Sequence, residues 1–286
     1  MTNDTRVKLN LAAPILGAVL ALLAAAMLSG CATIRTMPGI GAALTPAWDE
    51  ATLASCWNGA NAEQRMMNLL SPHFSAGKVR DYLAWQKGRG ANTVHLILCN
   101  RADGEGGGYS IYGATPGARK VDTAWAKLAR DRISQCRGEG FAIVLWGLTD
   151  DDGGWNRQIL SDPARYMRDL DAAGLLDYCS IFVLGLEMTE WKCSTAQITR
   201  YRDAVRAVYK GKIGTHHNSE RVDYANLGDV LMYQTEPGKS AAQIRTLTRK
   251  ALTTGKPVNF FELSRHEDRA LCEAALKGGA FAVGNW

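Results

Sequence analysis

The chain has 286 residues, with 33 Lys and Arg against 28 Asp and Glu, so its formal net charge is only +5 at pH 7. The basic residues are scattered rather than gathered into one patch, which argues against a nucleic-acid partner. Seven cysteines occur without a CxxC pair. The sequence therefore predicts no zinc site and no recognisable disulfide framework.

The first thirty residues have the order of an export signal. Arg6 and Lys8 form a short basic start, and an almost wholly apolar run, rich in Ala and Leu, follows from residue 9 to residue 27. The run ends in LSGC at 28–31, which resembles the lipobox of bacterial lipoproteins. The resemblance implies that Cys31 is lipidated and anchors the mature chain in the cell envelope, on the outer-membrane or periplasmic side because Ala32 rather than Asp follows. An ordinary signal peptide or a plain membrane anchor is the alternative.

The remaining chain is expected to be a tether over 31–44 and one domain over 45–286. Thr45 and Pro46 are typical of a helix start, so a short helix is expected over 46–56. Beyond it, short apolar runs alternate with helical patterns. Eight of these runs predict strands, at 66–70, 93–99, 141–148, 179–186, 212–215, 230–233, 258–261 and 280–283.

Helical patterns lie between most of the expected strands. Ser194 with Gln197, and Ser240 with Gln243, have the spacing of a capping box ahead of two of these helices. Residues 269–277 predict the seventh helix of the series. The connection between the fifth and sixth strands is shorter and has room for only a turn or two.

This alternation predicts a (β/α)₈ barrel. Continuous apolar runs are typical of parallel strands that are covered on both faces, and such barrels span about 250 residues. The sequence ends at Trp286, directly after the eighth run, so the eighth helix is expected to be missing and partly replaced by the 46–56 helix. The competing fold is an open, doubly wound sheet. No glycine fingerprint for a dinucleotide follows the first strand, which weakens that alternative, and no cofactor is expected.

Two glutamates follow directly after apolar runs. Glu187 closes the fourth expected strand and Glu262 closes the seventh. A carboxylate in such a place is costly to desolvate unless it has partners, and a barrel has its active site at the carboxyl ends of its strands. Retaining glycoside hydrolysis needs two carboxyl groups about 5–5.5 Å apart, one as acid/base and one as nucleophile. Trp146 and Trp155 could add flat apolar faces on which a sugar packs.

The pattern resembles the large superfamily of retaining (β/α)₈ glycoside hydrolases over about residues 60–286. That superfamily has its acid/base Glu at the end of strand 4 and its nucleophile Glu at the end of strand 7, which implies those roles for Glu187 and Glu262. The resemblance also implies that Tyr233 on strand 6 donates a hydrogen bond to the nucleophile. It further implies that His216 on strand 5 lines the site and that Trp286 after strand 8 forms the floor of a sugar subsite.

Three more side chains are expected to bind the substrate: Asn100, Asp150 and Trp191, which follow the second, third and fourth strands. One position departs from the superfamily, which usually has Asn directly before the acid/base residue. Leu186 stands there in this chain. Either Asn100 or Asn218 takes over that contact, or the protein is a non-catalytic envelope lipoprotein that binds a glycan without cutting it.

A metal-dependent sugar isomerase or hydrolase is the third interpretation. His216 and His217 are adjacent, and the acidic run 150–152 could hold a hard cation. Adjacent residues of a strand face opposite sides, however, so only one of the two histidines can reach the barrel axis. The first strand also lacks the His-x-His of metal-dependent barrels. The expectation is therefore a monomeric glycosidase without a metal, acting on an oligosaccharide or polysaccharide with a β linkage.

Overall fold

The computed structural model describes residues 66–88, 91–101, 107–149, 154–218, 224–235, 238–263 and 269–284. All of these residues belong to one compact unit, which runs from Pro38 to Trp286. The expected signal, Cys31, the tether and the 46–56 helix lie outside the described residues. Asp150 and Trp286 lie outside them as well.

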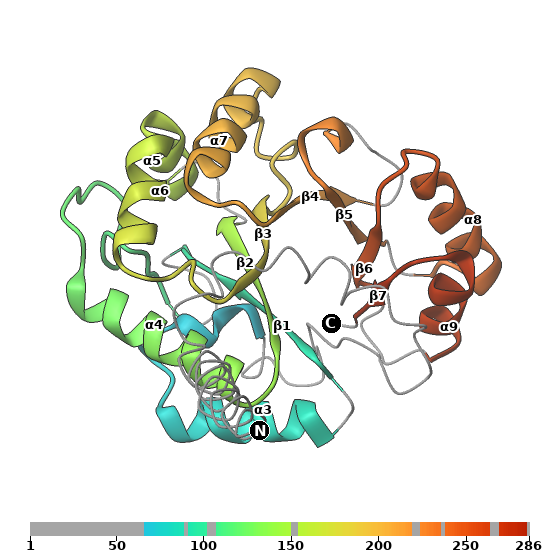
Figure 1. Cartoon of the computed structure of the whole chain (residues 1–286), viewed down its shortest axis with the longest axis horizontal. Coiled ribbons are helices and arrows are strands. Elements are labelled where there is room, and N and C mark those ends of the chain that lie inside the picture. The colour runs from blue at the N-terminus through green and yellow to red at the C-terminus, as the bar shows by residue number, and fades with distance from the viewer. Residues whose placement is uncertain are drawn as a thin grey trace, which may run out of the picture. The chain divides into compact units, whose positions relative to one another are not determined.

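Seven parallel strands form a single sheet in which each strand pairs with the next along the chain (Figure 1). They are β1 Thr93–Ile97, β2 Ala142–Leu148, β3 Cys179–Gly185, β4 Lys212–Asn218, β5 Val230–Gln234, β6 Val258–Glu262 and β7 Ala282–Val283. A doubly wound sheet needs a point at which the strand order reverses, and this sheet has none among its described strands. The architecture is that of a (β/α)₈ barrel.

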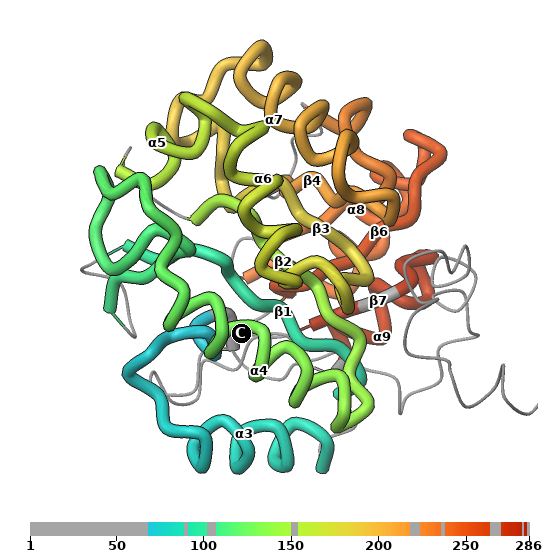
Figure 2. Tube along the Cα trace, turned by 60° about the vertical axis from the view of Figure 1, so that its left-hand side comes forward, coloured from blue at the N-terminus to red at the C-terminus, as the bar shows by residue number. Residues whose placement is uncertain are grey.

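Helices lie on the outer side of the curled sheet (Figure 1). They are α3 Ala76–Gly88, α4 Thr123–Gly138, α5 Trp155–Ser161, α6 Pro163–Ala172, α7 Thr195–Val208, α8 Ala241–Leu252 and α9 Arg269–Gly278, and η4 Ala225–Leu227 forms the short connection between β4 and β5. Figure 2 shows the chain from another direction, with α6 and α7 against the β2–β3 side of the sheet. Both predicted capping boxes are confirmed, since Ser194 and Ser240 each exchange hydrogen bonds with the Gln three residues later.

The first expected strand is wrong. Residues Met66–Leu70 form a 3₁₀ helix, η3, which packs beside β1. Side chains of α4 bind carbonyl groups in this helix and directly after it: Nη1 of Arg132 donates to the carbonyls of Leu69 (2.6 Å) and Ser71, and Nε1 of Trp125 donates to that of Leu70 (3.2 Å). A short apolar run fits a buried helical turn as well as a strand, so periodicity could not separate the two.

Four rings from four strands meet inside the barrel. Trp146 of β2 has its ring centre 5.5 Å from that of His216 on β4 and 4.7 Å from that of Phe261 on β6. His95 of β1 stacks on Phe261 at 5.7 Å, although β1 and β6 are not neighbours in the sheet. These contacts cross the interior and show which face of each strand points inward. Three of these strands, β2, β4 and β6, alternate in the sheet, as the strands that contribute to one layer of such a barrel usually do.

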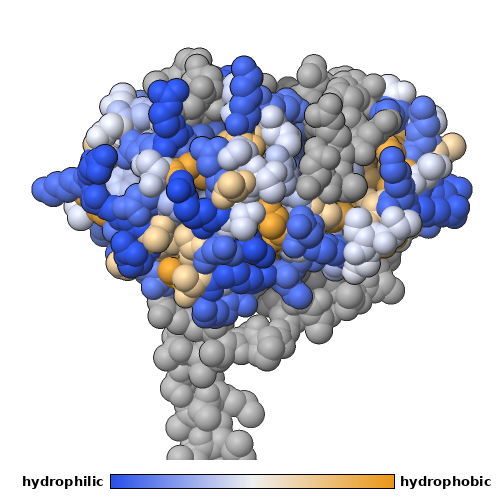
Figure 3. All heavy atoms as spheres, turned by 90° about the horizontal axis from the view of Figure 1, so that it is seen from above, coloured by the Kyte–Doolittle hydropathy of each residue, from blue (hydrophilic) through white to orange (hydrophobic). Residues whose placement is uncertain are grey.

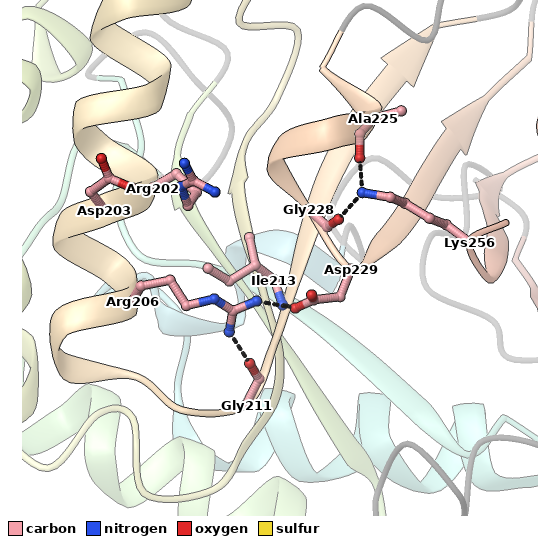
Figure 4. Close-up of polar contacts among 9 residues, drawn as sticks. All are labelled: Arg202, Asp203, Arg206, Gly211, Ile213, Ala225, Gly228, Asp229 and Lys256. Carbon is pink, nitrogen blue, oxygen red and sulfur yellow. Dashed lines mark hydrogen bonds and ion pairs between the residues drawn. The ribbon is translucent and has the colours of Figure 1, made fainter. Parts of the chain in front are cut away.

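The network in Figure 4 lies where β4 and β5 begin, at the end of the sheet opposite to the strand-end glutamates. Arg206 of α7 pairs with Asp229, whose carboxylate also accepts a 2.9 Å hydrogen bond from the N–H of Ile213. Burial alone would raise the pKa of Asp229, but these two partners outweigh it and lower the pKa. Lys256 donates to the carbonyls of Ala225 and Gly228. Contacts at this end of a barrel stabilise the fold.

The described surface in Figure 3 is mostly hydrophilic, with apolar residues scattered between the charged ones. Within the described ranges, no helix is long and apolar enough to cross a membrane. The five cysteines there are all unbonded thiols. Cys99, Cys136 and Cys272 are buried, whereas Cys179 and Cys193 are partly exposed.

Candidate active site

Glu187 lies just beyond β3, in a tight turn. The ladder of β3 continues to Leu186, whose N–H donates to the carbonyl of Leu148 (3.2 Å), and the chain turns at the next residue. The carbonyl of Glu187 accepts hydrogen bonds from the N–H groups of Glu190 (2.8 Å) and Trp191 (3.1 Å). Glu187 is partly exposed, as a group that meets a substrate must be.

The backbone of Glu187 is in the left-handed region, with φ +42°. Only one other non-glycine residue in the described ranges has a positive φ, Lys192 at +59°, and it closes the same turn. A residue with a Cβ adopts this conformation at a cost, and such strain persists where the surrounding structure holds it. The turn that positions Glu187 is thus a strained one.

His216 of β4 is the partner that holds this turn to the barrel. The N–H of Glu187 donates a 2.8 Å hydrogen bond to Nδ1 of His216, whose ring lies edge-on against Trp146 and Phe261. Burial, and secondarily His217, lowers the pKa of His216 to about 3, while Gln234 beside it opposes part of that shift. At neutral pH His216 is therefore an uncharged acceptor.

The two adjacent histidines face opposite sides, as strand alternation predicts. Nε2 of His217 lies 3.0 Å from Oγ1 of Thr215, and its ring contacts Tyr233 at 5.5 Å. Tyr233 in turn contacts Phe260 at 5.4 Å and belongs to the core layer between the sheet and α8. The structure therefore places Tyr233 on the helix-facing side of β5, away from His216. It does not bring Tyr233 to the interior, where a bond to Glu262 was expected.

A bulge in β6 sets the direction of Glu262. Met232 of β5 pairs with Asn259, and Gln234 pairs with Glu262, so two residues of β6 stand opposite Tyr233 alone. Since Phe261 faces inward, strict alternation would turn Glu262 outward. The extra residue restores the register and places Glu262 opposite Gln234, on the side of His216. Bulges of this kind occur beside active sites, where they redirect a side chain.

Gln234 is a site residue that sequence reasoning did not select. It ends β5 between the strands that carry His216 and Glu262, and its Oε1 is buried. Nε2 of His216 is buried as well, and the side chain of Gln234 lies close enough to influence the pKa of that ring. Period-2 alternation from the inward-facing Met232 would have identified Gln234, and it would also have placed Tyr233 on the other face.

The remaining expected sugar contacts divide into three groups. Trp191 is partly exposed, and its Nε1 is buried without a partner in the described part of the chain. Asn100 is buried, and it holds the segment after β1 in place because its Nδ2 donates a hydrogen bond to the carbonyl of Gly107 (3.0 Å). Trp146 and Trp155 are fully buried, so they are core residues and not exposed platforms. Nε1 of Trp155 donates to the carbonyl of Asn100 (3.0 Å).

No group of three or more His, Cys, Asp or Glu side chains suited to a metal ion occurs within the ranges that the structure describes. Asp150, which was considered for both sugar and metal binding, lies outside them, as does the rest of the acidic run 150–152.

The geometry thus gathers Glu187, His216, Gln234 and Glu262 at the carboxyl ends of four consecutive strands. His216 contacts the backbone of Glu187 on one side and the ring of Phe261, the neighbour of Glu262, on the other. Of the two carboxyl side chains, that of Glu262 belongs to a strand and that of Glu187 to the turn after a strand, and carboxyl groups are among the side chains that serve as a catalytic acid or base.

Comparisons with known proteins point to the same architecture. No family model and no curated protein matches the sequence. Among solved structures, a glycoside hydrolase family 5 protein of Bacteroides vulgatus ATCC 8482 is similar at a TM-score of 0.57 and 13% identity, over 82% of this chain and 57% of that one. The exo-β-1,4-mannosidase Op5Man5 of Opitutaceae bacterium strain TAV5 matches at a TM-score of 0.56 and 14% identity, over 82% and 51%.

A third similar structure is a GH113 β-1,4-mannanase, at a TM-score of 0.52 and 13% identity, over 82% of this chain and 87% of that one. The chain thus spans little more than half the length of the first two structures and most of the third. At these identities the likeness concerns the fold. The chain shares its (β/α)₈ fold with these glycoside hydrolases.

Proposed function

We propose that this protein hydrolyses a β-linked glycan with retention, with Glu187 as acid/base and Glu262 as nucleophile. The observation that supports the proposal is the bulge in β6. It pairs Glu262 with Gln234 of β5, the strand that also pairs with the strand of His216, and the backbone of Glu187 is hydrogen-bonded to His216. In the first step Glu187 protonates the leaving oxygen while Glu262 attacks the anomeric carbon. In the second step Glu187 activates the water that releases the sugar from Glu262.

β-1,4-Mannan is the first substrate to test, because two of the similar structures act on β-1,4-linked mannose by their names. Glu187→Gln and Glu262→Gln are each expected to lower kcat on the cleaved glycan by about 100- to 10,000-fold. Glu190→Gln is the matched control, since Glu190 is exposed in the same turn. Full hydrolysis by both site variants, or its loss in Glu190→Gln alone, would contradict the assignment. NMR of the first-formed product reports whether the anomeric configuration is retained.

A second candidate function is glycan binding without turnover. It is favoured by Leu186, an apolar and nearly buried residue where the superfamily usually has Asn, so that no side-chain amide is supplied from this position. Calorimetry on the same glycan panel separates the two candidates. Binding that is not followed by product, in wild-type protein at high concentration, would favour the binding protein over the hydrolase.

The lipid anchor at Cys31 remains part of the proposal for localisation. The supporting observation is the LSGC sequence after an apolar run of the length of a signal. A Cys31→Ser variant is expected to leave the membrane fraction when the full chain is expressed in a bacterial host that processes lipoproteins. If the variant stays in the membrane fraction as the wild type does, lipidation at this residue is not the anchor.

A further inference from the structure

We propose that His216 is a positioning residue, whose Nδ1 holds the backbone of Glu187 in the left-handed conformation that directs its carboxyl group. The inference rests on the proposed role of Glu187 as acid/base. In this role His216 binds the protein backbone, whereas the resemblance implies that it lines the site and contacts the sugar.

The first step of the argument is the strain at Glu187. Its φ of +42° is unfavourable for a side chain with a Cβ, and glycine or asparagine would adopt it more readily. Glutamate is therefore held there by contacts. Its carbonyl accepts two hydrogen bonds within the turn, from Glu190 and Trp191, and its N–H donates to His216, which lies outside the turn. That last bond connects the strained residue to β4.

The second step is the rigidity of the acceptor. The His216 ring meets both Trp146 and Phe261 edge to face, at 5.5 and 5.1 Å between ring centres. Trp146 is fixed in turn by the hydrogen bond from its Nε1 to Nδ1 of His95 (3.1 Å). The position of Nδ1 on His216 is thus set by an aromatic layer that spans the barrel. Side chains locked by packing of this kind are the means by which proteins hold reacting groups in place.

The third step is chemical. A ring nitrogen can accept a hydrogen bond only when it is unprotonated, so the neutral tautomer of His216 has its proton on Nε2. Burial favours that neutral form, as does the neighbouring His217. Because Nδ1 is engaged by the Glu187 N–H and Nε2 is buried, His216 presents no free acceptor to a sugar hydroxyl.

Two substitutions test the hydrogen-bond acceptor of His216 and its aromatic ring one at a time. His216→Phe keeps an aromatic ring against Trp146 and Phe261 but has no acceptor, whereas His216→Asn places its Oδ1 near the position of Nδ1 and gives up the ring. We expect His216→Phe to lower kcat by about 100-fold with little change in KM, the size of effect that follows from a misplaced catalytic group. His216→Asn is expected to recover most of this loss. His217→Phe makes the same exchange on the other face of β4 and is expected to keep the wild-type kcat.

A higher KM with an unchanged kcat in His216→Phe would overturn the proposal, because that pattern marks a substrate contact. A wild-type kcat in the same variant would overturn it too. NMR of the ¹⁵N-labelled wild-type protein gives a test without substrate: a coupling across the hydrogen bond between the Glu187 amide and Nδ1 of His216 supports the proposal, and an Nδ1 that is protonated refutes it. This measurement remains decisive if no glycan is hydrolysed, so a failure of the proposed function is distinguishable from a failure of the positioning role.

Discussion

Nδ1 of His95 accepts a 3.1 Å hydrogen bond from Nε1 of Trp146 inside the barrel. The bond fixes the neutral tautomer of His95, just as the Glu187 N–H fixes that of His216. Burial lowers the pKa of both histidines to about 3. The same aromatic layer therefore contains two imidazoles that must stay uncharged for the barrel to keep its packing.

The two histidines predict an acid-sensitive fold. Their folded pKa lies below the ordinary value of 6.5, so the unfolded state binds more protons between those limits. Their stabilising contribution is complete above pH 6.5 and declines as the pH falls toward 3. Within that window, each neutral histidine makes the unfolding free energy fall by about 1.4 kcal/mol for each pH unit of acidification.

Urea denaturation of wild type and His216→Asn between pH 4 and pH 8 measures this contribution directly. The difference between their unfolding free energies is expected to shrink by about 1.4 kcal/mol per pH unit below pH 6, since the variant has one such histidine fewer. Above pH 7 the two curves should be parallel. Curves that stay parallel down to pH 4 would show that His216 is not held neutral.

Arg132 is expected to be the largest single polar contribution to the amino-terminal part of the barrel. Its guanidinium, inside α4, donates to the carbonyls of Leu69, Ser71 and Phe74, and burial lowers its pKa. Arg132→Met leaves these carbonyls without that donor, which should cost about 3 kcal/mol of unfolding free energy. Arg130→Met on the exposed face of the same helix should stay within about 0.5 kcal/mol of wild type. Equal effects in the two variants would refute the role of Arg132.

Sequence patterns predicted the strands that carry the site, because each is a continuous apolar run with a polar residue after it. They could not predict the structure of 66–70, since nothing local shows that Arg132, more than sixty residues later, binds its carbonyls. Nor could they predict the conformation of Glu187, because the usual sign of a positive φ is a glycine, and none stands there.

The side assigned to Tyr233 shows a different limit. The resemblance implies a role for Tyr233 from the strand on which it lies, whereas the face of a strand is decided by parity and by bulges. Parity from His216 through its pair Met232 puts Tyr233 with His217, on the outer side. The bulge that returns Glu262 to the inner side arises from pairing between two strands, which a single sequence does not display.

Gly147 of β2 lies against the Tyr201 hydroxyl, so substitutions at the two residues can be tested together. A Cβ at this position would lie 2.0 Å from the Tyr201 hydroxyl and 2.7 Å from the Phe182 ring, so Gly147→Ala should destabilise the fold by about 2 kcal/mol. That hydroxyl is buried and has no hydrogen-bond partner among the described residues. Tyr201→Phe should therefore be neutral or stabilising, and it should recover part of the loss in the double variant. Additive effects in denaturation experiments would contradict this account of the contact.

The strain at Glu187 can be measured without any substrate, by comparing two variants that both remove its carboxyl group. Glu187→Gly relieves the left-handed backbone, whereas Glu187→Ala keeps a Cβ there. The glycine variant is expected to be more stable by about 1 kcal/mol, the reverse of the usual order, since glycine ordinarily costs conformational entropy. The control is Ala126→Gly inside α4, which should lose about 1 kcal/mol. If urea denaturation gives the alanine form the higher unfolding free energy at both sites, Glu187 is not strained. Suppose instead that the two sites differ as expected and that both Glu187 variants are inactive on the glycan. The strained backbone of Glu187 then lowers the stability of the fold, and it is kept because it positions the carboxyl group in the site.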